Sequence, residues 1–445
     1  MVATPSRCDA NGRFPSAQYV VVGPGRRDDL IAVRATFGLV VSDDGGRRFR
    51  FLCEEAFEYR DGYDPSLAWT ANGTLLVGVE DGLQASATLC DPVRRRELDG
   101  QYVVDLTNDP TGRVVLAALR SRDADPVMRV ARSDDGGATF DVPRDGLASM
   151  APLTVDIAPS DTARVYASAL ADPNGARDPV LLRSDDGGRA WRRTRAVFPG
   201  ATDVYVSGVD PLRPEVVYMR ARLRSTADGG ALDTGSALYV STDGAESVRE
   251  LARTVGPMAG FALSGDGARV WIGGPDPRDG LRLREGDGEF RAVSPVGVEC
   301  LRWHAGALYV CESLGAGGAV LSRSRDDGST REPLVRVEGV LPPPPSCASS
   351  SIVSGFCADR WVSIRATTLS ALRDAGALDA AADVPRDVAA EGPAAPPPSG
   401  CGTCATTPTP TTSALAWTAL CALGVVRSGR RALTRRASRG QRRAR

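Results

Sequence analysis

The chain has 445 residues, and its 54 basic side chains nearly balance its 55 acidic ones, which leaves a formal net charge of −1. Such a balance gives no global positive field for nucleic acid. Every basic residue is arginine, and the single histidine is His304, within an expected strand. The composition therefore excludes Schiff-base lysine chemistry, histidine-rich zinc sites and most histidine-based nucleophile schemes.

A short phrase of the form S-x-D-x-G recurs along the chain, with intervals of 91, 51, 57 and 83 residues between successive copies. Each wide interval has room for two units, and halving it gives about 42 to 46 residues, the length of one four-stranded propeller blade. We therefore predict an all-β fold, a seven-bladed β-propeller over residues 18–340 with unmarked second and sixth blades. The phrases begin at Ser42, Ser133, Ser184, Ser241 and Ser324.

Within the first unit, apolar runs at residues 19–22, 30–36, 38–42 and 48–52 are separated by Gly, Pro and Asp. These runs predict the four strands of one blade. The third unit has the same pattern in VVDL, RVVLAAL, VMRVARS and TFDV, and the fourth in LTVDI, RVYASAL, VLLRS and AWRRT. Continuous apolar runs are typical of strands buried on both faces, as in stacked blades.

The repeated phrase resembles the Asp box, or BNR repeat, of sialidases, sortilin and related propellers. The resemblance implies that each box is a hairpin turn, in which the Asp accepts backbone N–H groups and Gly supplies a positive φ. It also implies that the trailing aromatic packs between sheets and that the carboxylates are structural rather than catalytic. The residues so assigned are Asp44, Gly46 and Phe49; Asp135, Gly137 and Phe140; Asp186, Gly188 and Trp191; Asp243; and Asp326 and Gly328.

Two of these boxes depart from the pattern. In the fourth box, Ala245 replaces the second Gly and Val248 replaces the aromatic residue. In the fifth box, Arg331 stands at the aromatic position.

An Asp-box glycoside hydrolase is the alternative function. Sialidases need an arginine triad, a Tyr–Glu nucleophile pair and an Asp acid/base, and they have six blades where seven are expected here. The motif at residues 11–15 (NGRFP) matches the sialidase signature only faintly. Other glycosidases place two carboxylates on facing loops. The loops at residues 171–178 and 225–235 gather Asp172, Asp178, Asp228 and Asp233, whose simplest role is turn chemistry, and their spacing fits no regular calcium loop.

Aromatic and polar side chains of two blades are further candidates for a ligand platform, although strand positions in the core are the simpler interpretation. They are Tyr205, Tyr218 and Tyr239 in the fifth blade and Trp303, His304, Tyr309 and Glu312 in the seventh.

Ten cysteines and no metal-ligand pattern favour an oxidising compartment. Cys300 and Cys311 bracket a hairpin-length stretch, which predicts one disulfide. Cys53 and Cys90 close similar points of the first two blades, and Cys347 and Cys357 bracket nine residues, so we expect two more pairs, although spacing alone leaves the connectivity open. The last pair would staple a short helical tail at residues 341–375.

The two ends of the chain differ from the repeats. Residues 1–17 are polar and lack the apolar region of a signal peptide, which suggests that the true start lies upstream. Residues 376–400 are rich in Ala and Pro and form an expected linker. The apolar stretch at residues 413–426 would reach only about 21 Å as a helix, short of a full bilayer core.

Residues 401–445 combine a Cys motif, that apolar stretch and nine arginines among the last 19 residues. This arrangement resembles the MYXO-CTERM sorting signal. The resemblance implies a myxosortase-type protease that processes Cys401 or Cys404, and transient anchoring at the inner membrane through residues 413–426 with the positive side inward. Nucleic-acid binding by the arginines is not expected, because no aromatic residue interleaves them.

Together these features predict an exported, surface-sorted propeller that binds a glycan or protein partner without catalysis, through its axis and the longer loops of blades 4 and 5. No cofactor and no metal are expected.

Overall fold

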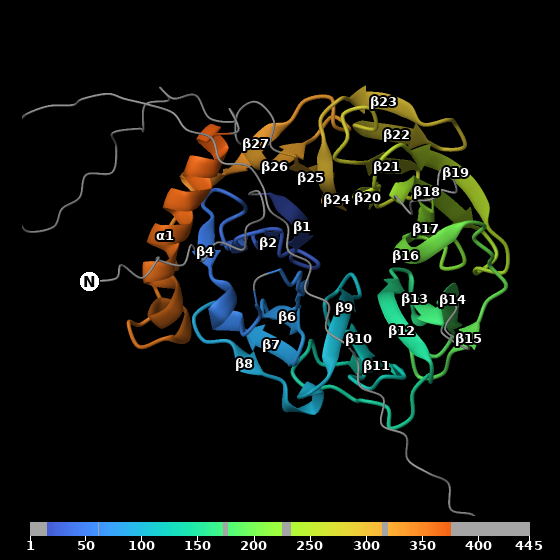
Figure 1. Cartoon of the computed structure of the whole chain (residues 1–445), viewed down its shortest axis with the longest axis horizontal. Helices are drawn as coiled ribbons and strands as arrows, with labels where there is room; N and C mark the ends of the chain where they lie inside the picture. The colour runs from blue at the N-terminus through green and yellow to red at the C-terminus, as the bar shows by residue number, and fades with distance from the viewer. Residues whose placement is uncertain (1–15, 61, 172–176, 225–232, 314–318, 375–445) are drawn as a thin grey trace, which may run out of the picture. The chain divides into compact units, whose positions relative to one another are not determined.

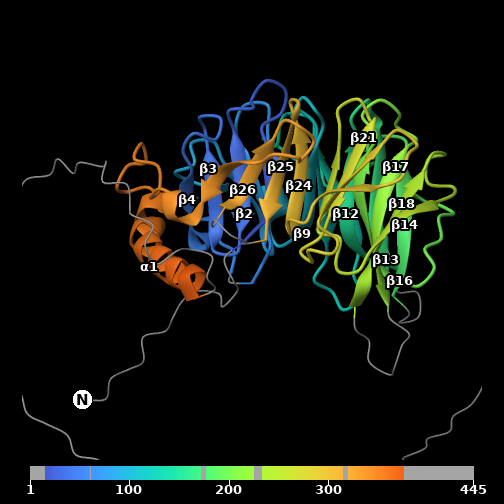
Figure 2. The same cartoon turned by 90° about the horizontal axis from the view of Figure 1, so that it is seen from above.

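Seven antiparallel sheets follow one another along the chain in the computed structural model, which describes residues 16–60, 62–171, 177–224, 233–313 and 319–374. Each sheet uses only consecutive strands. Figure 1 shows the sheets arranged in a ring with the first strand of each sheet nearest the centre, and Figure 2 shows the ring from the side. The predicted seven-bladed β-propeller is therefore confirmed.

The strands of the first three blades are short to medium in length. Blade 1 contains β1 (Ala17–Val22), β2 (Ile31–Ala35), β3 (Gly38–Ser42) and β4 (Arg50–Leu52), and blade 2 contains β5 (Ser66–Trp69), β6 (Leu75–Val79), β7 (Gly82–Ser86) and β8 (Val93–Arg94). Blade 3 contains β9 (Tyr102–Asn108), β10 (Val115–Arg120) and β11 (Met128–Ser133). Two 3-10 helices, η1 (Glu54–Phe57) and η2 (Arg96–Leu98), follow β4 and β8.

The remaining four blades each have four strands. Blade 4 contains β12 (Met150–Ala158), β13 (Asp161–Ala171), β14 (Asp178–Ser184) and β15 (Arg192–Arg193), and blade 5 contains β16 (Ala201–Val209), β17 (Val217–Arg224), β18 (Asp233–Ser241) and β19 (Arg249–Thr254). Blade 6 contains β20 (Gly260–Leu263), β21 (Arg269–Gly273), β22 (Leu281–Glu285) and β23 (Arg291–Ser294), and blade 7 contains β24 (Val298–His304), β25 (Ala307–Glu312), β26 (Ala319–Ser324) and β27 (Glu332–Arg336). The 3-10 helix η3 (Val337–Gly339) and helix α1 (Ile352–Asp374) follow.

Blade 3 corrects one expectation. The TFDV segment was expected to form its fourth strand, but the sheet has three strands, and only an isolated bridge joins Arg132 to Asp141. Pro143 follows two residues later and cannot donate to a strand ladder, which is a physical reason for the early end of pairing.

Apolar side chains pack between neighbouring blades. Every residue of β3, β6 and β7 is buried. One cluster joins Leu76 of blade 2 to Val103 of blade 3, and another joins Trp271 of blade 6 to Leu308 of blade 7. Burial against a blade on each side explains why the strands have continuous rather than alternating apolar runs.

The innermost strands fall into two kinds. In blades 1, 3, 4, 5 and 7 these strands have six to nine residues, and each has a register shift against its neighbour. In blades 2 and 6, β5 and β20 have four residues each and pair without a shift. The short, regular strands therefore belong to the two blades that lack the repeated phrase. Bulges re-aim side chains and are enriched beside functional sites.

Blade 1 contains only the first four strands of the propeller, and blade 7 contains only the last four, so the two blades share no strand. A segment after blade 7, residues 340–374, instead crosses to blades 1 and 2, and we call it the strap. Its Leu341 accepts a hydrogen bond from the N–H of Phe51 (3.0 Å) and donates one to the carbonyl of Phe49 (2.9 Å). Trp361 of α1 then stacks on Phe51 with ring centroids 4.9 Å apart.

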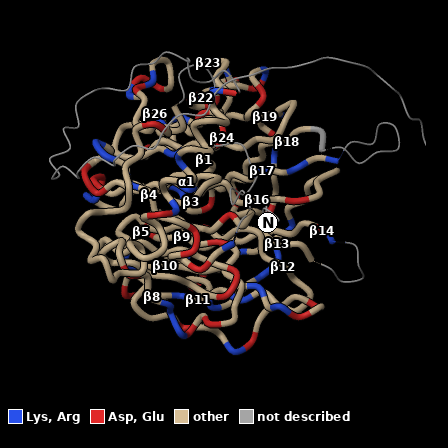
Figure 3. Tube along the Cα trace, turned by 60° about the vertical axis from the view of Figure 1, so that its left-hand side comes forward, with Lys and Arg blue, Asp and Glu red and all other residues tan. Residues whose placement is uncertain are grey.

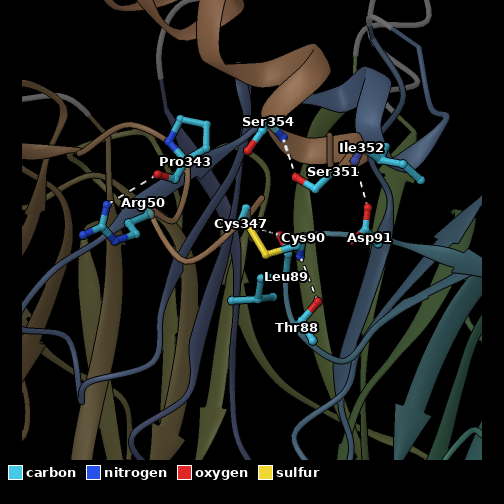
Figure 4. Close-up of a disulfide and its surroundings, with 10 residues drawn as sticks. All are labelled: Arg50, Thr88, Leu89, Cys90, Asp91, Pro343, Cys347, Ser351, Ile352 and Ser354. Atoms are coloured by element: carbon cyan, nitrogen blue, oxygen red, sulfur yellow. Dashed lines mark hydrogen bonds between the residues drawn. A yellow bond between two sulfur atoms is a disulfide. The ribbon is translucent and has the colours of Figure 1, made fainter. Parts of the chain in front are cut away.

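Two disulfides fix the strap to the propeller. Cys357 of α1 bonds Cys53 of blade 1, and Cys347 bonds Cys90 of blade 2, as Figure 4 shows for the second bridge. The expected pairs Cys53–Cys90 and Cys347–Cys357 are therefore wrong, because the strap brings each of its cysteines to a different blade. The third disulfide joins Cys300 and Cys311, which face each other across β24 and β25, as expected. Three disulfides are typical of an exported protein.

The expected helical tail is present as α1. The N-terminal segment up to residue 15, the linker, Cys401, Cys404 and the apolar stretch at 413–426 lie outside the described residues. In the described parts of the chain, no helix is both long and apolar enough to cross a membrane.

Candidate functional site

The five Asp-box carboxylates each belong to their own turn. In the first box, Oδ1 of Asp44 accepts the N–H groups of Arg47 (3.0 Å) and Arg48 (2.9 Å), and the hydroxyl of Ser42 donates to it (2.9 Å). Asp135, Asp186, Asp243 and Asp326 accept the N–H of the residue four positions later in the same way. Because their oxygens are engaged locally, in five different blades, the boxes do not form a shared catalytic cluster.

Hydrogen bonding stabilises the charged form of these carboxylates. Partial burial alone would raise the pKa of Asp135, but the hydroxyl and N–H of Thr139 together with Ser133 lower it to about 2. The hydroxyl and N–H of Ser247 lower the pKa of Asp243 to about 2. Such carboxylates remain ionised at all physiological pH values and cannot act as general acids there.

The two altered boxes keep the same turn by other means. Ala245 takes the Gly position with a φ of 72°, which an L residue rarely adopts. At the aromatic position of the fifth box, Arg331 donates to the carbonyl of Gly328 (3.1 Å), as Trp191 does to Gly188 (2.9 Å) in the third. The ring of Trp191 is half-buried, whereas Phe49 and Phe140 are buried.

Near the axis, blades 1 and 5 each contain a Tyr–Arg pair that contacts the start of the short innermost strand of the following blade, β5 or β20. Tyr19 of β1 lies opposite Arg34 of β2, and the guanidinium is 5.4 Å from the ring centroid. Arg34 donates to the carbonyls of Asp64 (3.4 Å) and Pro65 (3.1 Å), directly before β5. The short strand leaves these carbonyls without a ladder partner, and the arginine of the preceding blade satisfies them.

The second pair repeats this geometry across the ring. Tyr205 of β16 lies opposite Arg220 of β17, whose guanidinium is 5.2 Å from the ring centroid. Arg220 donates to the carbonyls of Met258 (2.8 Å) and Ala259 (3.1 Å), directly before β20. Arg222 lies over the same tyrosine ring at 5.9 Å.

Two half-buried carboxylates, Asp105 of β9 and Asp156 of β12, complete this region. Burial raises the pKa of Asp105 to about 7 despite the N–H groups that Val155 and Leu106 donate, and the charge of Asp156 adds to the rise. Burial raises the pKa of Asp156 to about 6, although the hydroxyl of Thr107 donates to it (3.1 Å) and Arg302 lowers the value.

These groups act on one another electrostatically although they come from five blades. Asp105, Arg302, Arg34 and Asp156 all affect the pKa of Tyr19, which burial raises, and Arg34 and Asp105 both affect that of Arg220. We call the set the axial cluster: Tyr19, Arg34, Asp105, Asp156, Tyr205, Arg220 and Arg302. With three arginines against two partly protonated carboxylates, the cluster is net positive at neutral pH.

The carboxylates also link blades. Asp105 of blade 3 accepts the N–H of Val155 in blade 4 (2.9 Å), and Thr107 of blade 3 binds Asp156 of blade 4. Thr154 accepts the N–H of Val206 in blade 5 (2.8 Å) in the same manner. The first role of these side chains is therefore to join adjacent innermost strands.

The other candidate residues do not converge. Tyr218 and Tyr239 are buried against Phe261 and Phe198, and Trp303 stacks on Trp271. Glu312 pairs with Arg331 (3.1 Å). Of the candidates, Tyr205 lies in the axial cluster, and His304 and the buried Tyr309 line a separate cleft.

Of the four acidic-loop aspartates, only Asp178 has a described side chain. Asp178 is exposed at the first residue of β14, Asp233 is described only by its backbone as the first residue of β18, and Asp172 and Asp228 lie outside the described residues. The described residues include no group of three His, Cys, Asp or Glu side chains suited to a metal ion.

Of the axial cluster, only Tyr205 was among the candidate residues predicted from the sequence. A usable signal was present, since Asp105 and Asp156 interrupt apolar first strands of consecutive units in matching motifs, VVDL and TVDI. Acidic and basic residues are interspersed along the propeller in Figure 3.

Comparisons with known proteins show the fold and little else. No family model matches the chain, and no curated protein matches it. Among solved structures, an ancestral GH74 enzyme has a TM-score of 0.54 at 14% identity, covering 72% of this chain and 46% of its own. Hydrazine synthase of Kuenenia stuttgartiensis has a TM-score of 0.49 at 12% identity over 69% and 96%, and YCF48 bound to D1 peptide has 0.39 at 11% over 70% and 86%.

The chain thus spans about half the length of the GH74 enzyme. The likeness to the GH74 enzyme shows the β-propeller fold alone. At these identities the comparisons carry no assignment of activity.

Proposed function

We propose that the chain is a non-catalytic binding module, exported and sorted to the cell surface, that takes a protein partner at the axial cluster. The observation that carries this proposal is that Asp105 and Asp156 both accept hydrogen bonds from an adjacent blade, whereas Arg302 of the same cluster is exposed. Arg302 has no hydrogen-bond or ion-pair partner within the described ranges. Arginine and tyrosine are the side chains most enriched where protein partners bind tightly.

A protein partner fits this site better than a glycan does. Sugar rings bind to uncovered aromatic faces, whereas the rings of Tyr19 and Tyr205 are covered by Arg34, Arg220 and Arg222. The net positive charge favours a partner segment that carries carboxylates. Export is supported by the disulfides, and surface sorting rests on the resemblance of residues 401–445 to MYXO-CTERM signals.

The test uses the purified full chain on an array of acidic and neutral peptides and on a glycan array. We expect selective capture of acidic peptides, and Arg302→Ala should weaken it at least about ten-fold. Arg249→Ala is the matched control, because Arg249 is also exposed and unpaired among the described residues but lies on β19 at the outer edge of blade 5. Selective capture of glycans, or equal binding by both variants, would contradict the proposal.

A glycoside hydrolase is the second candidate, favoured by one observation. Asp105 and Asp156 come from adjacent blades and have raised pKa values, as a catalytic acid requires. Hydrolysis of chromogenic glycosides by the wild-type chain, lost in Asp105→Asn, would establish this candidate in place of the binding module.

A further inference from the structure

Neighbouring blades are joined at the Asp-box turns by a recurring contact. A side chain of one blade donates to a backbone carbonyl in the box of the next blade: Arg132 to Gly187 (3.0 Å), Arg183 to Gly244 (3.5 Å) and Trp271 to Asp327 (3.1 Å). The accepting residue is the fourth of its box each time. Arg95 donates similarly to Gly137, the fifth residue of its box (2.7 Å).

The junction between blade 7 and blade 1 lacks this contact among the described residues. Gly45 is the fourth residue of the first box, and a Cβ built there would meet nothing within 4 Å. A Cβ at Gly187 or Gly244 would instead lie 2.6 Å or 2.3 Å from the guanidinium of the preceding blade. The space that an arginine fills at the junctions of blades 3 and 4 and of blades 4 and 5 is therefore open at this one.

A charge reversal explains the open junction. Arg132 and Arg183 are each held by the second residue of their own box, Asp134 (2.9 Å) and Asp185 (2.8 Å). In the seventh blade the second box residue is Arg325, which repels rather than holds Arg323.

Arg323 turns away accordingly and pairs with Glu332 (2.9 Å). Its Nε is buried without a hydrogen-bond partner. Arg323 therefore does not donate to the carbonyl of Gly45 in blade 1, as Arg132 and Arg183 donate to the equivalent carbonyls of Gly187 and Gly244.

The result is a cleft of about 340 Å³ at the junction, the seam cleft, which lies at the lower end of the usual size of small-molecule sites. Its lining is polar and comes from both blades: Asp28, Asp29, Asp44, Gly45 and Arg47 of blade 1, and His304, Ala305, Ala307, Tyr309, Arg323 and Arg325 of blade 7.

Several charged groups of the seam cleft have no partner within the described residues. The exposed side chains of Arg47, Arg325 and Asp28 make no hydrogen bond or ion pair there, and Nε2 of His304 is buried without one. Burial and the charge of Arg302 lower the pKa of His304, although the charge of Asp28 raises it. The exposed unpaired groups therefore offer two guanidinium groups and one carboxylate to a ligand.

We infer that the seam cleft binds a single acidic sugar unit, a hexuronate, whose carboxylate pairs with Arg325 and Arg47 and whose hydroxyls bind Asp28. Guanidinium groups match a carboxylate in two parallel hydrogen bonds. A carboxylate accepts hydrogen bonds from hydroxyl groups, and the small polar cleft has room for one ring. This cleft has no lining residue in common with the axial cluster, although Arg302 acts electrostatically on His304.

The test is calorimetric titration of the full chain with D-glucuronate and D-galacturonate, beside D-glucose and acetate. For a ligand of this size we expect a Kd of about 1 mM for at least one uronate, and no measurable binding of glucose or acetate. Acetate that binds as tightly as the uronates would reduce the cleft to an adventitious ion site and overturn the inference, as would failure of both uronates.

Variants separate the cleft from the rest of the fold. Arg325→Asp introduces the acidic residue that the first three boxes have at this position, and it should weaken uronate binding at least about ten-fold without lowering the melting temperature. Asp28→Asn should also weaken it, and Arg249→Asp, with the same charge change on the exposed β19, should leave it unaltered. Uronate binding that survives Arg325→Asp would overturn the inference, whatever the axial cluster binds.

Discussion

Gly188 and Gly328 occupy the same place in two Asp-box turns, with φ of 92° and 96°. Any L residue is strained at these angles, at a cost of about 1 to 2 kcal/mol. The two sites differ in space, however. A Cβ at Gly188 would meet its nearest neighbours at 3.6 Å, whereas at Gly328 it would lie 2.3 Å from Cδ2 of the fully buried Leu281.

Gly188→Ala should therefore lower the free energy of unfolding by about 1 to 2 kcal/mol, and Gly328→Ala by clearly more. Urea denaturation of both variants at pH 7 checks the order. Equal losses would mean that the blade 6–7 packing adapts without cost, contrary to the rigid packing inferred here.

At this scale the sequence is informative wherever a local rule applies. The box Ser, Asp and Gly were predicted because a turn of eight residues contains all of its own partners. Asp105 and Asp156 were not identified, since their partners lie about 50 residues away on an adjacent blade. The replacement of an acidic box residue by Arg325 is visible in the sequence. The cleft that it leaves open is not, because the sequence does not show that blade 1 lies next to blade 7.

Among the elements, the strap is the part of the chain that joins the last blade to the first two. Its disulfides span 304 and 257 residues of chain, whereas Cys300–Cys311 spans 11. A cross-link restricts the unfolded chain more when the loop it closes is longer. The strap disulfides should therefore contribute more to stability than the hairpin disulfide does.

The double variant Cys53→Ser/Cys357→Ser should lose about 2 to 5 kcal/mol of unfolding free energy, and more than Cys300→Ser/Cys311→Ser loses. Chemical denaturation of the two variants under non-reducing conditions measures both losses. A larger loss for the hairpin pair would contradict the assigned role of the strap.

The same contrast explains how far the cysteines could be interpreted from sequence. A pair 11 residues apart in a predicted hairpin is nearly self-evident, because the two residues face each other across adjacent strands. Cys53 and Cys90 pair with cysteines of the strap, which lies next to blades 1 and 2 only in the closed ring. The spacing of cysteines along the chain does not reveal this proximity. Strand number failed similarly in blade 3, where a predicted fourth strand is reduced to a bridge.

Across the whole propeller, the axial carboxylates make stability depend on pH. The folded pKa values of Asp105 (about 7) and Asp156 (about 6) lie above the usual value near 4. The folded state consequently binds protons more tightly than the unfolded chain between about pH 4 and 7. The stabilisation that protonation provides is present at pH 4 to 5 and is lost as the pH rises through 6 and 7.

The melting temperature should thus fall between pH 5 and pH 8, and Asp105→Asn should make the fall smaller, since the amide stays neutral throughout. Scanning calorimetry at several pH values tests this. An unchanged slope in Asp105→Asn would show that the carboxyl is ionised well below pH 7. The Asp-box carboxylates act in the opposite sense, but only near pH 2 to 4, where their lowered pKa values place their titration.

The attachment of α1 also determines how the molecule would carry a mechanical load. A pull on the chain beyond Asp374 first reaches Cys357, whose bond to Cys53 passes the force into the first sheet. The last sheet is bypassed, so tension at that end would not peel β27 from its neighbours. A propeller held through this end would resist unfolding by shear until the Cys53–Cys357 disulfide is reduced.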